Sequence, residues 1–135
     1  MATRGLRNNN PGNIRYDKKQ IWQGEIRGSR KKDKAFCEFV SMAYGYRALL
    51  KTLVNYRKLY GLKTISEMIS RWAPPNENDT RRYASFVASE MGMDPASPVD
   101  VDDGDEMCRM AAAISRFENG EPAVMADVRA GWKLM

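Results

Sequence analysis

Carboxylates are the side chains best suited to acid–base chemistry in this sequence of 135 residues, because it contains no histidine. Histidine is the general base of Ser-His-Asp and Cys-His nucleophile systems and the imidazole ligand of many zinc sites. Its absence excludes these kinds of site. Cys37 and Cys108 are far apart and lie among apolar neighbours, which indicates two buried free thiols. The sequence also lacks a Gly-rich phosphate loop and a GxSxG motif. We therefore predict no cofactor and no metal.

Glu118 is the first candidate for a catalytic acid. It lies in the predicted last turn of an apolar helix that ends at Asn119-Gly120. A carboxylate at this position opposes the helix macrodipole, which favours the protonated form that a general acid needs. An ordinary exposed Glu beside a helix-ending glycine has the same pattern, so a surface role stays open.

Two further carboxylates are candidates for the partner of that acid. Glu77 lies in the Pro-rich loop at residues 71–80, and Glu38 lies in a predicted strand at residues 35–40. Glycosidases that use a pair of carboxylates hold them about 5–10 Å apart. The alternatives are support of a helix N-terminus for Glu77 and a solvent-facing strand position for Glu38.

Asparagines crowd a turn near the N-terminus, and their amides can pair with sugar hydroxyl and acetamido groups or with the local backbone. Aromatic rings elsewhere could offer faces to sugars, although at helical spacing such rings are more often core residues. The candidate substrate-binding residues are Asn8, Asn9, Asn10, Asn13, Trp22 and Tyr83.

The elements that must position these groups fall into two regions of one domain spanning residues 1–135. Residues 1–40 contain a turn signal and two short strand candidates, 21–26 and 35–40, which predicts a small β-hairpin lobe with a basic tip at 28–34. From residue 41 the apolar spacing becomes helical. Caps and breakers predict about five helices, over residues 41–61, 64–73, 79–92, 105–120 and 122–132, and a mostly α (α+β) fold.

Charge is distributed unevenly along the chain, although the net charge is only +5. Residues 1–34 hold ten Lys or Arg against three Asp or Glu, whereas residues 83–135 hold four against ten. A basic first part suits a polyanion. Nucleic acid ranks last among such partners because no recognition helix or aromatic-studded strand accompanies the charge. No apolar run reaches the ~20 residues of a membrane span, and no secretory signal is recognisable, so we expect no membrane insertion.

Several stretches together resemble a known group of proteins. They are Arg7 to Arg15 (RNNNPGNIR), Trp22-x-Gly24, Phe36-x-x-Phe39, Tyr44-Gly45-x-Arg47-Ala48, Arg71 to Thr80 (RWAPPNENDT), Ala113-Ile114 and Glu118-Asn119-Gly120. In these the sequence resembles small phage and prophage virion proteins of the lysozyme-like, peptidoglycan-degrading superfamily. Phe117 is a departure, because such sequences often have His before the Glu-Asn-Gly triplet.

The resemblance implies a lysozyme-like fold in which a catalytic Glu ends a helix just before an Asn-containing stretch. Only seven residues precede Asn8, and none of them is acidic. We therefore predict a circular permutation in which Glu118, at the end of the fourth helix, faces the turn at Asn8 to Asn13 across a cleft.

The implied function is cleavage of peptidoglycan by a muramidase or lytic transglycosylase of a phage, during wall penetration or lysis. The expected partners are bacterial peptidoglycan and other virion proteins, and we expect a monomer. The expected locations are the virion or the host cytoplasm before release, with action on the wall in the periplasm. A murein endopeptidase on the same fold, or a virion or wall-binding protein without turnover, are the alternatives.

Overall fold

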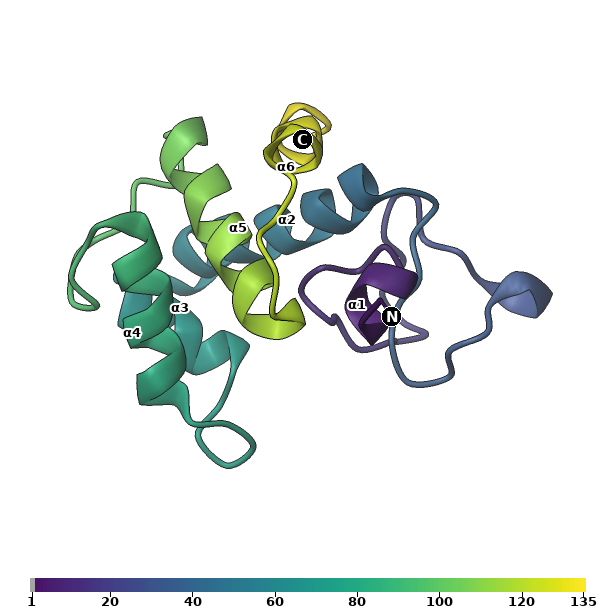
Figure 1. The fold of residues 1–135 in the computed structure, drawn as a ribbon, viewed down its shortest axis with the longest axis horizontal. Coiled ribbons are helices and arrows are strands. Elements are labelled where there is room, and N and C mark those ends of the chain that lie inside the picture. Colours follow the sequence, from purple (N-terminus) through teal and green to yellow (C-terminus); the bar gives the residue numbers. More distant parts are fainter. Residues whose placement is uncertain (1) are drawn as a thin grey trace.

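The computed structural model describes residues 2–135 and is mostly helical (Figure 1). Its longer helices match the five predicted ones closely. In chain order they are α2 (Met42–Tyr60), α3 (Ile65–Trp72), α4 (Thr80–Met91), α5 (Gly104–Asn119) and α6 (Met125–Lys133). The sequence reading did not predict two short elements, α1 (Arg4–Arg7) and the 3₁₀ turn η1 (Gly28–Arg30).

Local caps set most of these helix boundaries. The α3 helix begins with a complete capping box, in which Thr64 and Glu67 each accept from the other's backbone N–H. Asp79 caps α4 and Asp103 caps α5 through their side chains. The α6 helix starts at Met125, three residues later than the predicted start at 122.

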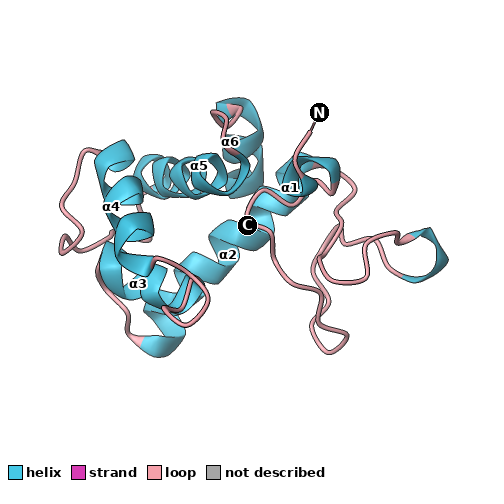
Figure 2. Ribbon diagram, turned by 60° about the horizontal axis from the view of Figure 1, so that its bottom comes forward, coloured by secondary structure: helices cyan, strands magenta, loops and turns pink. Residues whose placement is uncertain are grey.

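The α2 helix runs through the middle of the molecule and joins its two parts (Figures 1 and 2). It packs against α6 and α5, while α4 packs on α5 and on α3. Apolar side chains at helical spacing fill the space between them, and Leu50, Met68 and Ile114 are fully buried. Burial of this kind is the main stabilising contribution to the fold. No helix within residues 2–135 is long and apolar enough to cross a membrane.

The predicted β-hairpin of the N-terminal lobe is wrong. The expected strands at 21–26 and 35–40 meet in a single isolated bridge, Glu25 with Phe39, and Phe36 instead bridges to Arg15. The left-handed φ angles of Gly24 (75°) and Gly28 (78°) turn the chain away from an extended ladder. The region of residues 8–40 is a set of loops beside the helices (Figure 2).

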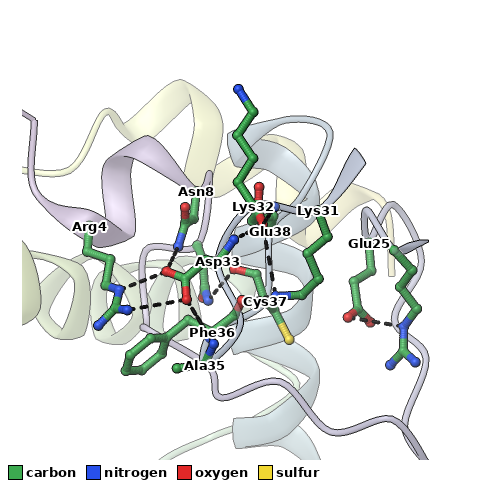
Figure 3. Close-up of polar contacts among 12 residues, drawn as sticks. Arg4, Asn8, Glu25, Lys31, Lys32, Asp33, Ala35, Phe36, Cys37 and Glu38 are labelled. Carbon is green, nitrogen blue, oxygen red and sulfur yellow. Dashed lines mark hydrogen bonds and ion pairs between the residues drawn. The ribbon is translucent and has the colours of Figure 1, made fainter. Parts of the chain in front are cut away.

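In these loops, side-chain hydrogen bonds connect segments that a β-hairpin would connect through backbone hydrogen bonds. Asp33 accepts hydrogen bonds from Arg4, Asn8 and the backbone N–H groups of Ala35 and Phe36 (Figure 3). These donors, chiefly Arg4, hold the pKa of Asp33 well below its usual value. The loop therefore closes around a partly exposed hydrogen-bond acceptor.

Close backbone approach fixes the lobe against the helices. A Cβ atom placed on Gly45, in the first turn of α2, would lie 1.9 Å from the Asn9 carbonyl oxygen. A Cβ on Gly5 would lie 2.6 Å from Asn119 Oδ1 at the end of α5. Glycine is therefore required at both positions for the Asn-rich turn to reach the helix ends.

Candidate functional site

A cleft of about 720 Å³ separates the N-terminal lobe from the helical part. On the lobe side it is lined by residues of the Asn-rich turn and by Trp22 and Phe36. On the helical side it is lined by one face of the second half of α2, the end of α3 and the loop that follows it. Glu118 lies on this lining and is half-buried. The cleft thus joins segments more than a hundred residues apart in the sequence.

Both oxygens of the Glu118 carboxylate accept hydrogen bonds. Asn13 Nδ2 donates to Oε1 at 2.9 Å, and the Tyr83 hydroxyl donates to Oε2 at 2.7 Å. One donor comes from the N-terminal turn and the other from α4. The expected meeting of Glu118 with the Asn-rich turn is present, and the carboxylate is held in one orientation.

Tyr83 belongs to a chain of donors behind Glu118 and is not a sugar-stacking surface. Its hydroxyl accepts from Trp72 Nε1 at 3.2 Å while donating to Glu118. Its ring is 1% exposed and stacks on Phe117, with ring centroids 3.9 Å apart. Burial, and then the Glu118 carboxylate, raise the pKa of Tyr83, so its hydroxyl keeps the proton that it donates. The prediction that Tyr83 offers a face to substrate is wrong, because the helix packing covers that face.

Of the four candidate asparagines only Asn13 lines the cleft. Asn10 is fully buried and donates to the carbonyl oxygens of Ile14 and Cys37. Asn9 donates to the Phe39 carbonyl, and Asn8 donates to Asp33. These three side chains hold the loops together and have their donors engaged there, so we withdraw them as substrate ligands.

The backbone conformation of Asn13 places its side chain at the cleft. Its φ angle of 51° is left-handed, a conformation that Asn adopts more readily than other side chains. This geometry aims its amide nitrogen at Glu118, whereas its oxygen is buried without a hydrogen-bond partner.

The two other candidate carboxylates are separated by the structure. Glu77 is exposed and lines the cleft from the loop between α3 and α4. Glu38 does not line the cleft, because it accepts from the backbone N–H groups of Lys32 and Asp33, both at 2.7 Å, and lies 3.9 Å from Lys31 Nζ (Figure 3). Glu38 is a loop anchor, and we withdraw it as a catalytic candidate.

Trp22 lines the cleft and is partly exposed, as a sugar-binding ring must be. Aromatic and basic side chains outside the list of candidate substrate-binding residues also line the cleft. They are Arg4, Arg15, Phe36, Tyr56, Tyr60, Arg71 and Trp72. Tyr60 is 54% exposed and forms part of this wall.

Asn119 is a further positioning residue; its sequence pattern indicated a helix end and part of the Glu118-Asn119-Gly120 stretch, but no positioning role. Its Nδ2 donates to the Pro11 carbonyl at 2.9 Å, and its Oδ1 accepts from Thr3 Oγ1 at 2.6 Å. It therefore fastens the end of α5 to the turn that carries Asn13. The adjacency of Asn119 to Glu118 was the only available signal for this role.

The two cysteines lie in the protein interior. Cys37 and Cys108 are buried and free, as predicted, and burial followed by the charge of Glu25 raises the pKa of Cys37 to about 12. Within residues 2–135 no group of three or more potential metal ligands lies together.

Comparison with known proteins gives one informative similarity. No protein-family model matches the sequence. The chain is 45% identical over 94 residues to Protein P5 of Pseudoalteromonas phage PM2, an alignment that covers 68% of this chain and 58% of the phage protein. The chain thus matches little more than half of that relative's length. It is similar to a phage protein over most of its own sequence.

Proposed function

We propose that this protein is a phage peptidoglycan glycosidase of the lysozyme-like, circularly permuted kind, with Glu118 as the general acid. The observation that carries the proposal is the Glu118 carboxylate, held from two sides by Asn13 and Tyr83 on the lining of an open cleft. A fixed carboxylate on the lining of an open cleft suits acid catalysis on a bound substrate. The similarity to a phage protein supports a phage origin of this chain.

In the proposed reaction, Glu118 gives its proton to the oxygen of a glycosidic bond as that bond breaks. One carboxyl oxygen keeps a donated hydrogen bond while the other presents the proton, so the acid stays oriented during transfer. Trp22 supplies an aromatic face for a sugar ring.

The role of Glu77 distinguishes two possible mechanisms for breaking the glycosidic bond. As a base it would activate water, which gives a hydrolase. If it is dispensable, the substrate's own 6-hydroxyl attacks C1 as the bond to the leaving sugar breaks, its proton passes to the Glu118 carboxylate, and the enzyme is a lytic transglycosylase. Glu77 is exposed on a loop and accepts no hydrogen bond within residues 2–135 that would fix it, which favours the second route.

The test is incubation of purified sacculi with the protein, followed by mass spectrometry of the released fragments. We expect anhydro-muropeptides, which are the products of a lytic transglycosylase. Reducing muropeptides would instead identify a hydrolase. Glu118→Gln should lower the rate about 100- to 10,000-fold, while Glu121→Gln, an exposed Glu just beyond the same helix, should match the wild type.

Other products would overturn the proposal. New peptide ends would identify an endopeptidase, and an unchanged wall that retains bound protein would identify a wall-binding component. A folded Glu118→Gln variant with full activity would exclude Glu118 as the acid.

A further inference from the structure

Two arginines on opposite sides of the cleft form no ion pair with any carboxylate within residues 2–135. Arg15 follows the Asn-rich turn on the lobe side, and Arg71 lies near the end of α3 on the helical side. Among the ion pairs within residues 2–135, Arg4 pairs with Asp33, whereas neither Arg15 nor Arg71 pairs with a carboxylate. Both side chains are exposed to the solvent of the cleft.

Aromatic rings hold both guanidinium groups in place. The Arg15 guanidinium lies 5.0 Å from the centre of the Phe36 ring. The Arg71 guanidinium lies 3.8 Å from the centre of the Tyr60 ring and 5.6 Å from that of Tyr56. Stacking of this kind restricts the guanidinium while leaving its edge free to donate hydrogen bonds. Less conformational freedom is then lost when a ligand binds.

The chemistry of a free guanidinium edge matches a planar oxyanion. Arginine forms paired, charge-assisted hydrogen bonds with carboxylates. Glu118 and Glu77 line the same cleft, but Glu118 is occupied by Asn13 and Tyr83, and Glu77 accepts no donor from either arginine. The free arginines are therefore available to a ligand.

We infer that the cleft selects wall glycans that carry free carboxylates on their peptide stems, with Arg15 and Arg71 as the carboxylate-binding residues on its two sides. This inference rests on the proposed function, because it names the substrate class of the same cleft. A neutral N-acetylated glycan would fit the aromatic faces but leave both guanidinium edges in water.

The test measures binding separately from cleavage, using the Glu118→Gln variant, whose cleavage rate is expected to be about 100- to 10,000-fold lower. The probes are peptide-bearing wall glycan fragments, the same fragments with their carboxylates converted to carboxamides, and a neutral chitooligosaccharide of equal length. We expect the carboxylated fragments to bind about tenfold more tightly than either neutral probe, which corresponds to roughly 1.4 kcal/mol.

Adding Arg15→Ala or Arg71→Ala should reduce this preference to about threefold or less and leave binding of the neutral probes unchanged. The matched control is Lys19→Ala, which removes an exposed cation from the same lobe outside the cleft lining and should keep the full preference.

Three results would overturn the inference. They are equal affinity for charged and neutral fragments, an equal loss in the Lys19→Ala control, and stronger binding to a single-stranded DNA of the same charge. The sacculus assay reports separately on the proposed function. A wall left uncut by the wild type, together with a carboxylate preference that the arginine variants lose, would reject the glycosidase and retain the binding site.

Discussion

At the scale of single residues, the site depends on hydrogen bonds whose donors come from distant parts of the chain. Glu118 is oriented by Asn13, more than a hundred positions earlier, and by Tyr83 on another helix. Trp72 in turn orients the Tyr83 hydroxyl. Such a chain fixes a carboxylate more firmly than any single bond, because each donor is itself held.

Tyr83→Phe removes the donor to Glu118 while keeping the buried ring. We expect kcat for wall cleavage to fall about tenfold with KM nearly unchanged, because the bond orients the acid and contacts no substrate. The matched control is Tyr46→Phe, which removes another buried hydroxyl, hydrogen-bonded to Ser115 at 2.9 Å. Both variants should lose about 1 kcal/mol of unfolding free energy. Equal loss of activity in the two variants would reduce Tyr83 to a structural residue.

At the scale of elements, the N-terminal loops are held by polar side chains where a hairpin was expected. Asp33 and Glu38 both accept backbone N–H donors of the loop at residues 32–36, and Asn10 ties Cys37, just after that loop, to the Asn-rich turn. Positive φ angles at Gly24 and Gly28 prevent a regular ladder. Loop stability in this region should therefore depend on the charge of its carboxylates.

The Asp33 cluster predicts a particular dependence of stability on pH. The pKa of Asp33 is lowered in the folded state, chiefly by Arg4. Its contribution is therefore present above the unfolded pKa of about 4 and is lost as the pH falls through and below that value. Urea unfolding should show the wild type about 1–2 kcal/mol more stable than Asp33→Asn at neutral pH. The difference should narrow below about pH 4, and a difference independent of pH would contradict the assignment.

At the scale of the whole molecule, the cleft exists because the lobe is fastened to the end of α5. Asn119 makes that attachment through Pro11 and Thr3, and the glycines at positions 5 and 45 allow the backbones to approach. The lobe side of the cleft comes from the first 36 residues, and the helical side comes from the second half of α2, the end of α3 and the loop after it, with Glu118 added from the end of α5.

Asn119→Ala should loosen this attachment. We expect a loss of about 2–3 kcal/mol of unfolding free energy, because buried hydrogen-bonding groups lose their partners. Amide hydrogen exchange should quicken in residues 3–14 more than in α2 or α4, and wall cleavage should fall because Asn13 no longer meets Glu118. Asn76→Ala, at an exposed loop position, is the control. Uniform acceleration of exchange throughout the chain would show global destabilisation and no specific attachment.

The sequence by itself determined the helices, because their signals are local. Each signal that sets a helix depends on residues a few positions apart. These signals are the apolar spacing, the Thr64 capping box, the Asp79 cap and the glycines at 61, 92 and 120. It also singled out Glu118 and the Asn-rich turn as neighbours, although that step needed the resemblance to a family.

Only the tertiary structure decided which side chains share the cleft. The alternation of residues 21–26 and 35–40 predicted strands, but long-range side-chain hydrogen bonds and two left-handed glycines gave loops. Asn8, Asn9, Asn10 and Asn13 are alike in sequence, yet only Asn13 reaches the cleft. Tyr83 and Trp72 have the spacing of core residues, and their hydroxyl and indole groups gain a role only because α3, α4 and α5 pack together. Local patterns fix helices because helical hydrogen bonds are local, whereas a site depends on contacts between distant segments.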